Sequence, residues 1–148
     1  ALPYADAAAP SAVKDREFTR NYAFLLTQVG QAPKAVTIYR DALGAENSQD
    51  FVLRQGYAYA LALAGDKTEA LKVYATVKRI AAEQPGKLKP GDWQALAGLA
   101  YELGEYQDAL DFDMKAPEAL RKDPAARFRM ARSYARLNRT NEAVDTFY

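Results

Sequence analysis

Residues 58–74 read AYALALAGDKTEALKVY, and this stretch decides the fold. Ala58 stands seven residues before Gly65, and Ala70 stands five residues after it. The same arrangement occurs four times, with turn residues 35, 39 and 34 residues apart: Gly30, Gly65, Gly104 and Asn138. Self-similarity at a period near 34 indicates a stacked helical array, in which each unit buries its apolar face only against its neighbours.

This alignment produces two columns of alanine. The column before the turn is Ala23, Ala58, Ala97 and Ala131, and the column after it is Ala35, Ala70, Ala109 and Ala143. Alanine lets helix backbones approach closely and keeps a high helix propensity, so both columns are predicted to be buried at helix crossings. The turn residues are expected to end each first helix in a left-handed conformation, which glycine adopts cheaply and asparagine tolerates.

The predicted fold class is all-α, an α-α superhelix of about four helix-turn-helix repeats, because apolar residues recur at three- and four-residue steps around each turn. The expected repeats are about 16–50, 51–89, 90–123 and an incomplete 124–148, with 1–15 as a linker or the tail of a preceding repeat. The longer third interval is assigned to residues 84–91, QPGKLKPG, which a helix would not tolerate whole. Asp66 and Asp92 are predicted to cap the helices that follow them.

These features resemble the tetratricopeptide repeat (TPR) family. Residues 93–97, WQALA, match the opening of its signature, and Ala35 to Tyr39, Ala70 to Tyr74 and Ala143 to Phe147 match the later half. Alanine replaces the signature glycine after leucine, and Asp113 stands at the late aromatic position of the third unit. The resemblance covers about residues 16–148 and implies a scaffold that binds a protein or peptide.

The last residues bear on the extent of the array. A terminal repeat normally presents a polar outer face, whereas Val144, Phe147 and Tyr148 are apolar or aromatic. We therefore expect a fragment of a longer array.

Composition argues against an enzyme. The chain has no cysteine and no histidine, which removes thiolate nucleophiles, the commonest general base and the commonest metal ligand. No cofactor or metal is expected, and Asp108, Asp111 and Asp113 are interpreted as a solvated acidic helix face because they lack the glycine turn and the glutamate of a calcium loop. The net charge of +1 argues against a nucleic-acid binder. The uncharged stretch at residues 21–32 is too short and too polar to span a bilayer.

The resemblance implies that the first helices line a concave face, with the partner-binding residues beside their buried stripe. By register these residues are Arg20, Phe24, Thr27, Gln55, Tyr59, Gln94, Tyr101, Phe128, Arg129, Arg132 and Arg136. Aromatic and arginine side chains are the usual anchors for an extended or helical peptide. Some family members hold a peptide C-terminus with lysine and asparagine, but Phe24 and Tyr59 occupy the asparagine places, which disfavours that ligand.

Two charged runs leave two interpretations open. Residues 120–140 carry seven Lys and Arg against one acid, and residues 102–118 carry six acids against one lysine. Arg129, Arg132 and Arg136 share a helix face suited to a carboxylate or phosphate. Alternatively the two runs pair with each other, and exposed pairs of that kind contribute only about 0–1 kcal/mol each.

Three functions were compared on these grounds. The leading prediction is a non-catalytic scaffold or adaptor that binds a protein or peptide in the concave groove. The second is an assembly module that forms homo-oligomers through uncovered repeat ends. The third is a bacterial cell-envelope scaffold associated with an anionic or polysaccharide-export system. The lack of cysteine fits cytoplasm and periplasm alike, and the alanine-rich start slightly favours the periplasm or cell envelope.

Overall fold

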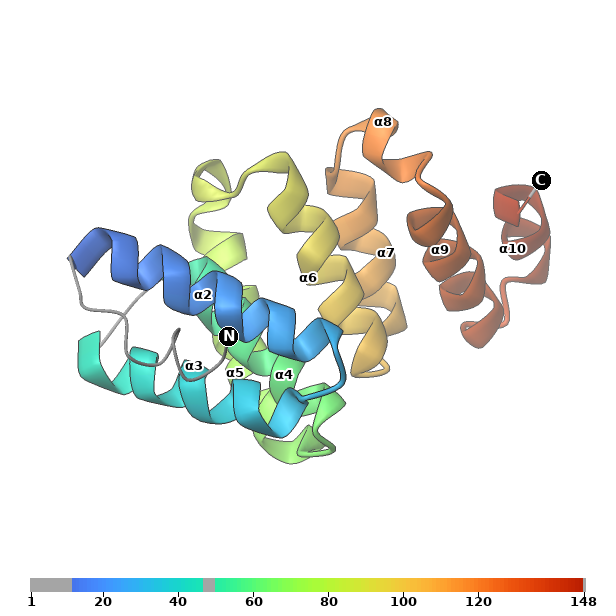
Figure 1. Ribbon diagram of the computed structural model, residues 1–148. Helices are drawn as coiled ribbons and strands as arrows, with labels where there is room; N and C mark the ends of the chain where they lie inside the picture. Colours follow the sequence, from blue (N-terminus) through green and yellow to red (C-terminus); the bar gives the residue numbers. More distant parts are fainter. Residues whose placement is uncertain (1–11, 47–49, 148) are drawn as a thin grey trace.

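The computed structural model describes residues 12–46 and 50–147, which form four helical hairpins (Figure 1). The first hairpin is α2 (Ala12–Gln28) with α3 (Ala32–Glu46), and the second is α4 (Phe51–Leu63) with α5 (Lys67–Glu83). The third is α6 (Pro90–Glu102) with α7 (Tyr106–Lys115), and the fourth is α9 (Pro124–Arg136) with α10 (Thr140–Phe147). The 3-10 turn η1 (Pro85–Lys87) precedes α6, and the short helix α8 (Glu118–Arg121) precedes α9. The predicted all-α class is confirmed for the described residues.

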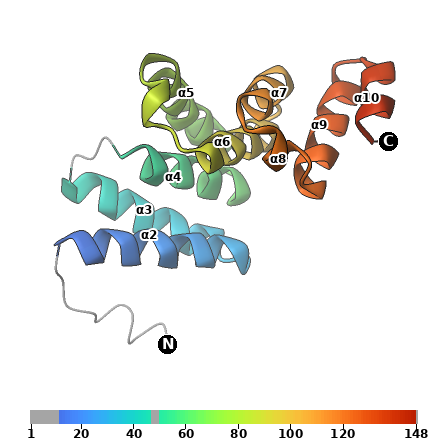
Figure 2. The same cartoon turned by 90° about the horizontal axis from the view of Figure 1, so that it is seen from above.

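The hairpins pack neighbour to neighbour. Each first helix contacts the next first helix in the order α2, α4, α6 and α9, while α3 packs on α4 and α7 packs on α9. Figures 1 and 2 show the hairpins succeeding one another from α2 and α3 to α9 and α10. The four first helices therefore form a continuous inner layer, as the repeat pattern predicts.

The four turn residues have the predicted left-handed backbone. The φ angle is 82° at Gly30, 92° at Gly65, 79° at Gly104 and 61° at Asn138. In each turn the following residue donates its N–H to the carbonyl five positions earlier, for example Asp66 to Leu61 at 3.0 Å. This hydrogen bond closes the helix end by satisfying a carbonyl that would otherwise lack an intrahelical donor.

Both alanine columns lie inside the stack. The column before the turn is buried in all four repeats, and the column after it is buried in the first three and half-buried at Ala143. Larger core side chains flank them, with the ring centroids of Trp93 and Phe112 separated by 6.2 Å. The columns are thus confirmed as points of close helix approach.

Of the two aspartates predicted to cap helices, one is an N-cap residue and the other is not. Asp66 is the N-cap of α5, and its carboxylate accepts the N–H of Glu69 at 3.2 Å. Asp92 is not the N-cap of α6, because that helix begins at Pro90, whose missing N–H is harmless in the first turn. Asp92 instead reaches back from the third helical position to accept the N–H of Lys89 at 2.8 Å.

The ends of the array differ in part from expectation. Helix α2 begins at Ala12, so residues 12–15 are helical, whereas the remainder of the expected linker, residues 1–11, lies outside the described residues. At the other end Val144 is 50% exposed, and the Phe147 side chain and Tyr148 lie outside the described residues. Across the described part of the chain, every helix is too short or too polar to traverse a bilayer.

Candidate partner-binding groove

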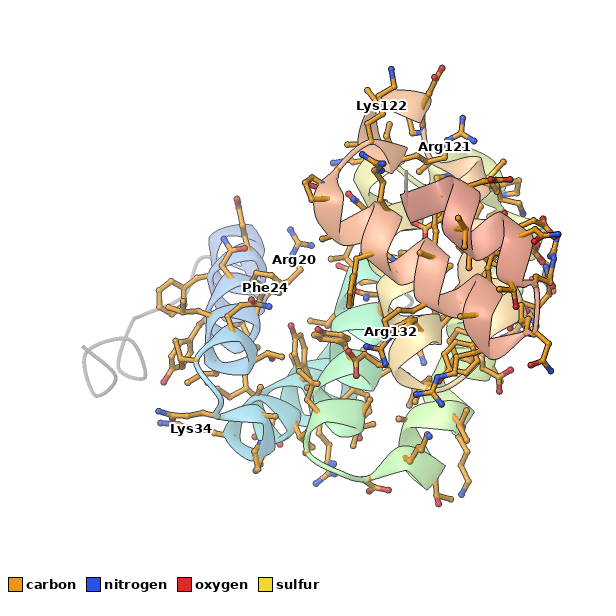
Figure 3. The ribbon with its side chains drawn as sticks, turned by 90° about the vertical axis from the view of Figure 1, so that its right-hand side faces the viewer. Arg20, Phe24, Lys34, Arg121, Lys122 and Arg132 are labelled. Carbon is orange, nitrogen blue, oxygen red and sulfur yellow. The ribbon has the colours of Figure 1, made fainter. Side chains whose placement is uncertain are left out.

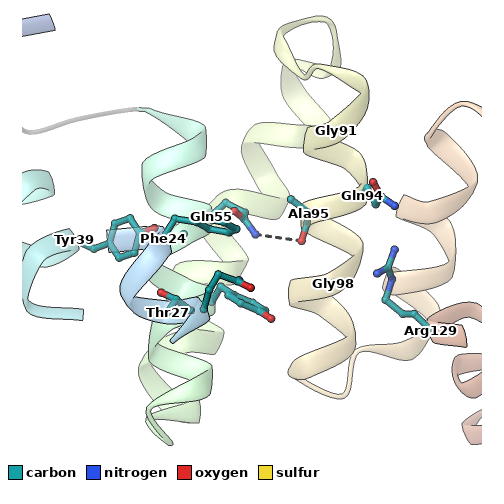
Figure 4. A pocket seen from close by; sticks show the side chains of 12 residues that line it. Phe24, Thr27, Tyr39, Gln55, Gly91, Gln94, Ala95, Gly98 and Arg129 are labelled. Atoms are coloured by element: carbon teal, nitrogen blue, oxygen red, sulfur yellow. Dashed lines mark hydrogen bonds between the residues drawn. The ribbon is translucent and has the colours of Figure 1, made fainter. Parts of the chain in front are cut away.

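A groove of about 320 Å³ lies along the inner layer of first helices (Figure 4). Helices α2, α4 and α6 supply most of its walls, and α3 and α9 contribute one residue each. The lining residues are Phe24, Thr27, Gln28, Tyr39, Gln55, Gly56, Tyr59, Gly91, Gln94, Ala95, Gly98 and Arg129. The groove therefore spans all four hairpins, although its sequence positions extend over more than 100 residues.

The structure brings six of the eleven predicted partner-binding residues to this groove. They are Phe24, Thr27, Gln55, Tyr59, Gln94 and Arg129. Phe24 is 55% exposed, and Tyr59 is half-buried. These two aromatic side chains, on α2 and α4, therefore form an apolar wall that a bound partner could cover.

The other five predicted residues do not line the groove. Arg20 lines a separate pocket at the start of α4, where its guanidinium lies 3.5 Å from the Asp50 carboxylate. Figure 3 shows Arg20 and Phe24 on α2, apart from Arg132 on α9. The remaining three are half-buried or exposed elsewhere in the stack: Tyr101, Phe128 and Arg136.

Contacts between aromatic rings and arginines account for the placement of these side chains. The Arg132 guanidinium lies 5.4 Å from the Phe128 ring, and the Arg136 guanidinium lies 6.0 Å from the ring of Tyr106. Tyr101 packs edge-on against Tyr106 with centroids 5.8 Å apart. These cation–π and aromatic contacts hold the side chains along α6, α7 and α9. The three arginines that were expected to share a helix face therefore have different partners. Arg129 binds Asp113, whereas Arg132 and Arg136 lie over aromatic rings.

Sequence reasoning missed the small residues of the groove floor. Gly56, Gly91, Ala95 and Gly98 line it. The Tyr39 ring fills the space beside Gly56, whereas Gly91 and Ala95 are exposed and Gly98 is half-buried. A signal for two of them exists in the alignment, because Gly56 and Ala95 both stand nine residues before a turn glycine. The side chain at this position is therefore small in two successive repeats.

Two polar side chains of the groove form hydrogen bonds within the protein. The Gln55 amide donates to the carbonyl of Ala95 at 3.2 Å and so links α4 to α6, as Figure 4 shows. The Thr27 hydroxyl donates to the Ala23 carbonyl of its own helix at 2.9 Å. Burial raises the pKa of Tyr59, with nearby Glu102 adding to the rise and Arg129 opposing it. Tyr59 is therefore a neutral hydrogen-bonding group at neutral pH.

Asp113 corrects the prediction of a solvated acidic face. Its side chain is 1% exposed, and Arg129 donates to both of its carboxylate oxygens, Nε at 2.9 Å and Nη2 at 2.6 Å. Burial raises the pKa of Asp113, and the hydrogen bonds and charge of Arg129 oppose that rise. A position where the repeat signature has an aromatic residue thus carries a buried ion pair between α7 and α9.

The two charged runs pair with each other only in part. Among the described ion pairs, Asp113 with Arg129 and Glu118 with Lys122 join them, the latter at 3.8 Å on the surface. Asp108 instead accepts from Lys78 at 2.9 Å and from the Tyr74 hydroxyl at 2.7 Å, both on α5. No cluster of three metal-ligating side chains occurs within the described ranges.

No protein-family model and no curated protein matches this sequence. Among solved structures, it is similar to the crystal structure of nearly identical TPR-like repeats from a candidate kinesin light chain of Podosopora anserina, with a TM-score of 0.65, 21% identity, and coverage of 86% of this chain and 69% of that chain. A point variant of those repeats matches with a TM-score of 0.68, 19% identity, and coverage of 93% and 74%.

This chain has the fold of TPR-like repeats. The predicted superhelix of helix-turn-helix units is thereby confirmed. The similarity lies in the arrangement of the hairpins, since about four residues in five differ between the aligned chains. The groove side chains therefore have to be interpreted from their own chemistry.

Proposed function

We propose that this chain is a non-catalytic scaffold that binds a peptide segment of a partner protein in the groove. The observation that carries the proposal is the pairing of two aromatic side chains, exposed Phe24 and half-buried Tyr59, with the small residues Gly91, Ala95 and Gly98 of α6. Small floor residues let a peptide backbone approach closely, and aromatic side chains give large buried area at low entropic cost. A volume of about 320 Å³ accommodates side chains of such a segment.

The rim of the groove supports recognition of a peptide. Gln28 is exposed and Gln94 is half-buried, and both line the groove from different helices. An amide side chain carries donors and an acceptor, so it can pair with the N–H and C=O groups of a peptide backbone. The chemistry of an enzyme is not supported by the sequence, which has neither histidine nor cysteine.

The proposal is tested by a matched pair of substitutions on α2. Phe24→Ser removes an aromatic side chain that lines the groove, whereas Phe18→Ser removes one that is 43% exposed on the same helix but does not line it. Randomised 12-residue peptides are selected on the unaltered protein, and their affinities are measured by fluorescence anisotropy. We expect Phe24→Ser to weaken binding by roughly tenfold or more and Phe18→Ser to leave it unchanged. Equal effects of the two variants would exclude the groove as the binding surface.

A second candidate function is self-association, and one observation favours it. Leu25 on α2 is 58% exposed, although the corresponding residues of the later first helices, Ala60, Leu99 and Ser133, are fully buried. Leu25 therefore occupies a repeat position that is buried in every later hairpin, and a helix of a second copy could cover it. Light scattering over a range of concentrations tests this, with Leu25→Glu expected to abolish any concentration-dependent mass and Leu63→Glu, on an exposed position of α4, expected to preserve it.

An envelope scaffold for anionic polymers has less support. It depends on the arginines of residues 120–140, and several of these have internal partners. Arg129 is bound to Asp113, Arg139 to Glu142, and the Arg132 guanidinium lies over Phe128. An anionic polymer would have to compete with these contacts, so we favour the peptide-binding scaffold.

A further inference from the structure

Equivalent positions of successive repeats meet at the first and third hairpin interfaces. The residue four positions after the second alanine is Tyr39, Tyr74 and Asp113 in the first three repeats. The residue nine positions before the turn is Gly56, Ala95 and Arg129 in the three repeats that follow them. Tyr39 packs against Gly56 at the first interface, and Asp113 binds Arg129 at the third.

An ion pair is not the simplest way to fill this interface. Removing two charges from water costs several kcal/mol per ion before their attraction is counted, and an apolar pair of similar volume is often as stable or more stable. The first interface shows that an aromatic ring against glycine fits the same position in this fold. The charged pair at the third interface therefore has a use besides packing.

The geometry of Arg129 indicates that it can bind a second carboxylate. A guanidinium offers two edges that each bind a carboxylate through two N–H groups. Asp113 occupies the edge formed by Nε and Nη2. The other edge, formed by Nη1 and the second hydrogen of Nη2, has no acceptor among the described residues, and Arg129 lines the groove.

This edge lies beside Gly98 in the groove. A Cβ atom added at residue 98 would stand 3.9 Å from Nη1, an ordinary van der Waals contact, and the Arg129 side chain keeps 13% of its surface exposed. The other described residues that line the groove carry no formal charge. A charged group on a bound peptide would therefore meet Arg129 and no competing ionic group of the lining.

We propose that Arg129 determines specificity by binding the carboxylate of an Asp or Glu side chain in the peptide, and that Asp113 is a positioning residue that fixes the guanidinium plane. This inference rests on the proposed function. Because Asp113 holds one edge, the second edge is presented without loss of side-chain entropy on binding. The preferred partner is an acidic peptide segment with at least one aromatic or aliphatic residue for the Phe24 wall.

The test uses the selected 12-residue peptides with acetylated and amidated ends, so that no terminal carboxylate is present. Each Asp or Glu is replaced in turn by Asn or Gln, and a third set carries phosphoserine at that position. We expect one amide replacement to weaken binding to the unaltered protein by roughly tenfold or more, the effect of losing a charge-assisted pair. Tighter binding of the phosphoserine set than of the carboxylate set would overturn the assignment of a carboxylate.

Three variants separate recognition from folding. Arg129→Lys keeps the charge but cannot donate two parallel N–H bonds to one carboxylate, and Asp113→Tyr with Arg129→Gly reproduces the pairing of Tyr39 with Gly56. Both are expected to reduce the acid-to-amide preference to less than about threefold while binding of the amide peptides is retained. Arg132→Ala, outside the groove on the same helix, is expected to keep the full preference.

The outcomes distinguish this inference from the proposed function. Two results would overturn the role of Arg129 and leave the proposed function standing. In the first, peptides bind through Phe24 but show no preference for the acid over the amide. In the second, that preference survives Arg129→Lys. Failure of all peptides, acidic and neutral, to bind the unaltered protein would overturn the proposed function together with this inference.

Discussion

Tyr39 of α3 packs so closely on the backbone of Gly56 in α4 that a Cβ atom added at residue 56 would stand 2.6 Å from the tyrosine hydroxyl oxygen and 2.7 Å from Cζ. Tyr39 is fully buried, so its ring cannot move away without disturbing the interface. We expect Gly56→Ala to lower the free energy of unfolding by about 1–3 kcal/mol through overpacking. Urea unfolding followed by far-ultraviolet circular dichroism measures this change.

Gly44→Ala is the matched control for that substitution. Gly44 lies within α3, and a Cβ atom there would meet nothing within 4 Å. Alanine is the better helix former, so this variant should be more stable by about 0.5–1 kcal/mol. A gain of stability at both positions would contradict the close packing of Tyr39 on Gly56.

Alkaline pH is expected to weaken the same interface. Burial raises the pKa of Tyr39 from 10.0 to about 12, although Arg20 opposes the rise. Because the folded protein favours the neutral phenol, this contribution to stability is complete below pH 10 and is lost as the pH rises to 12. A rise of this size corresponds to roughly 3 kcal/mol of stability. Urea unfolding at a series of pH values should show a smaller loss between pH 10 and 12 for Tyr39→Phe than for the unaltered protein, and parallel curves would contradict the prediction.

Gly65→Ala tests the left-handed turns separately from packing. A Cβ atom at Gly65 meets nothing within 4 Å, but φ is 92°, so the penalty is one of backbone conformation. We expect a loss of about 1–2 kcal/mol in unfolding free energy, and a smaller loss for Gly65→Asn because asparagine tolerates this region. Gly86→Ala, at an open position without a positive φ, should be neutral. If Gly65→Ala were also neutral, the turn glycines would not be needed for their conformation.

The turns and the alanine columns were predictable from sequence because each depends on a local requirement. A left-handed helix end selects glycine or asparagine, as Asn138 with φ of 61° illustrates. A close helix crossing selects alanine, and Ala58 and Ala70 are both fully buried. Such requirements repeat with the structural unit, so a single sequence displays them several times.

The groove was predictable only in part, because its shape depends on residues that the pattern treats as spacers. Gly98 was missed since a missing side chain gives no periodic signal. The sequence pattern predicts a solvated face for Asp113 because its neighbours Asp108 and Asp111 are acidic. Its burial depends on Arg129, which lies 16 residues away on another helix. A pairing between repeats can be inferred only once the helices have been placed side by side.

The ion pair between Asp113 and Arg129 provides the last prediction, a double-mutant cycle. Breaking a buried pair by removing one partner leaves an uncompensated charge and is strongly destabilising, so Asp113→Ala and Arg129→Ala should each cost about 3–5 kcal/mol in unfolding free energy. The double alanine variant should cost less than the sum of the two single variants, with a coupling of roughly 1–3 kcal/mol. Asp113→Tyr with Arg129→Gly should recover part of the loss, because an aromatic ring against glycine already fits the equivalent positions Tyr39 and Gly56, although glycine within a helix costs about 1 kcal/mol. Additive single effects, or an aromatic variant less stable than either single variant, would show that the two side chains act independently and that α7 and α9 are held together by other contacts.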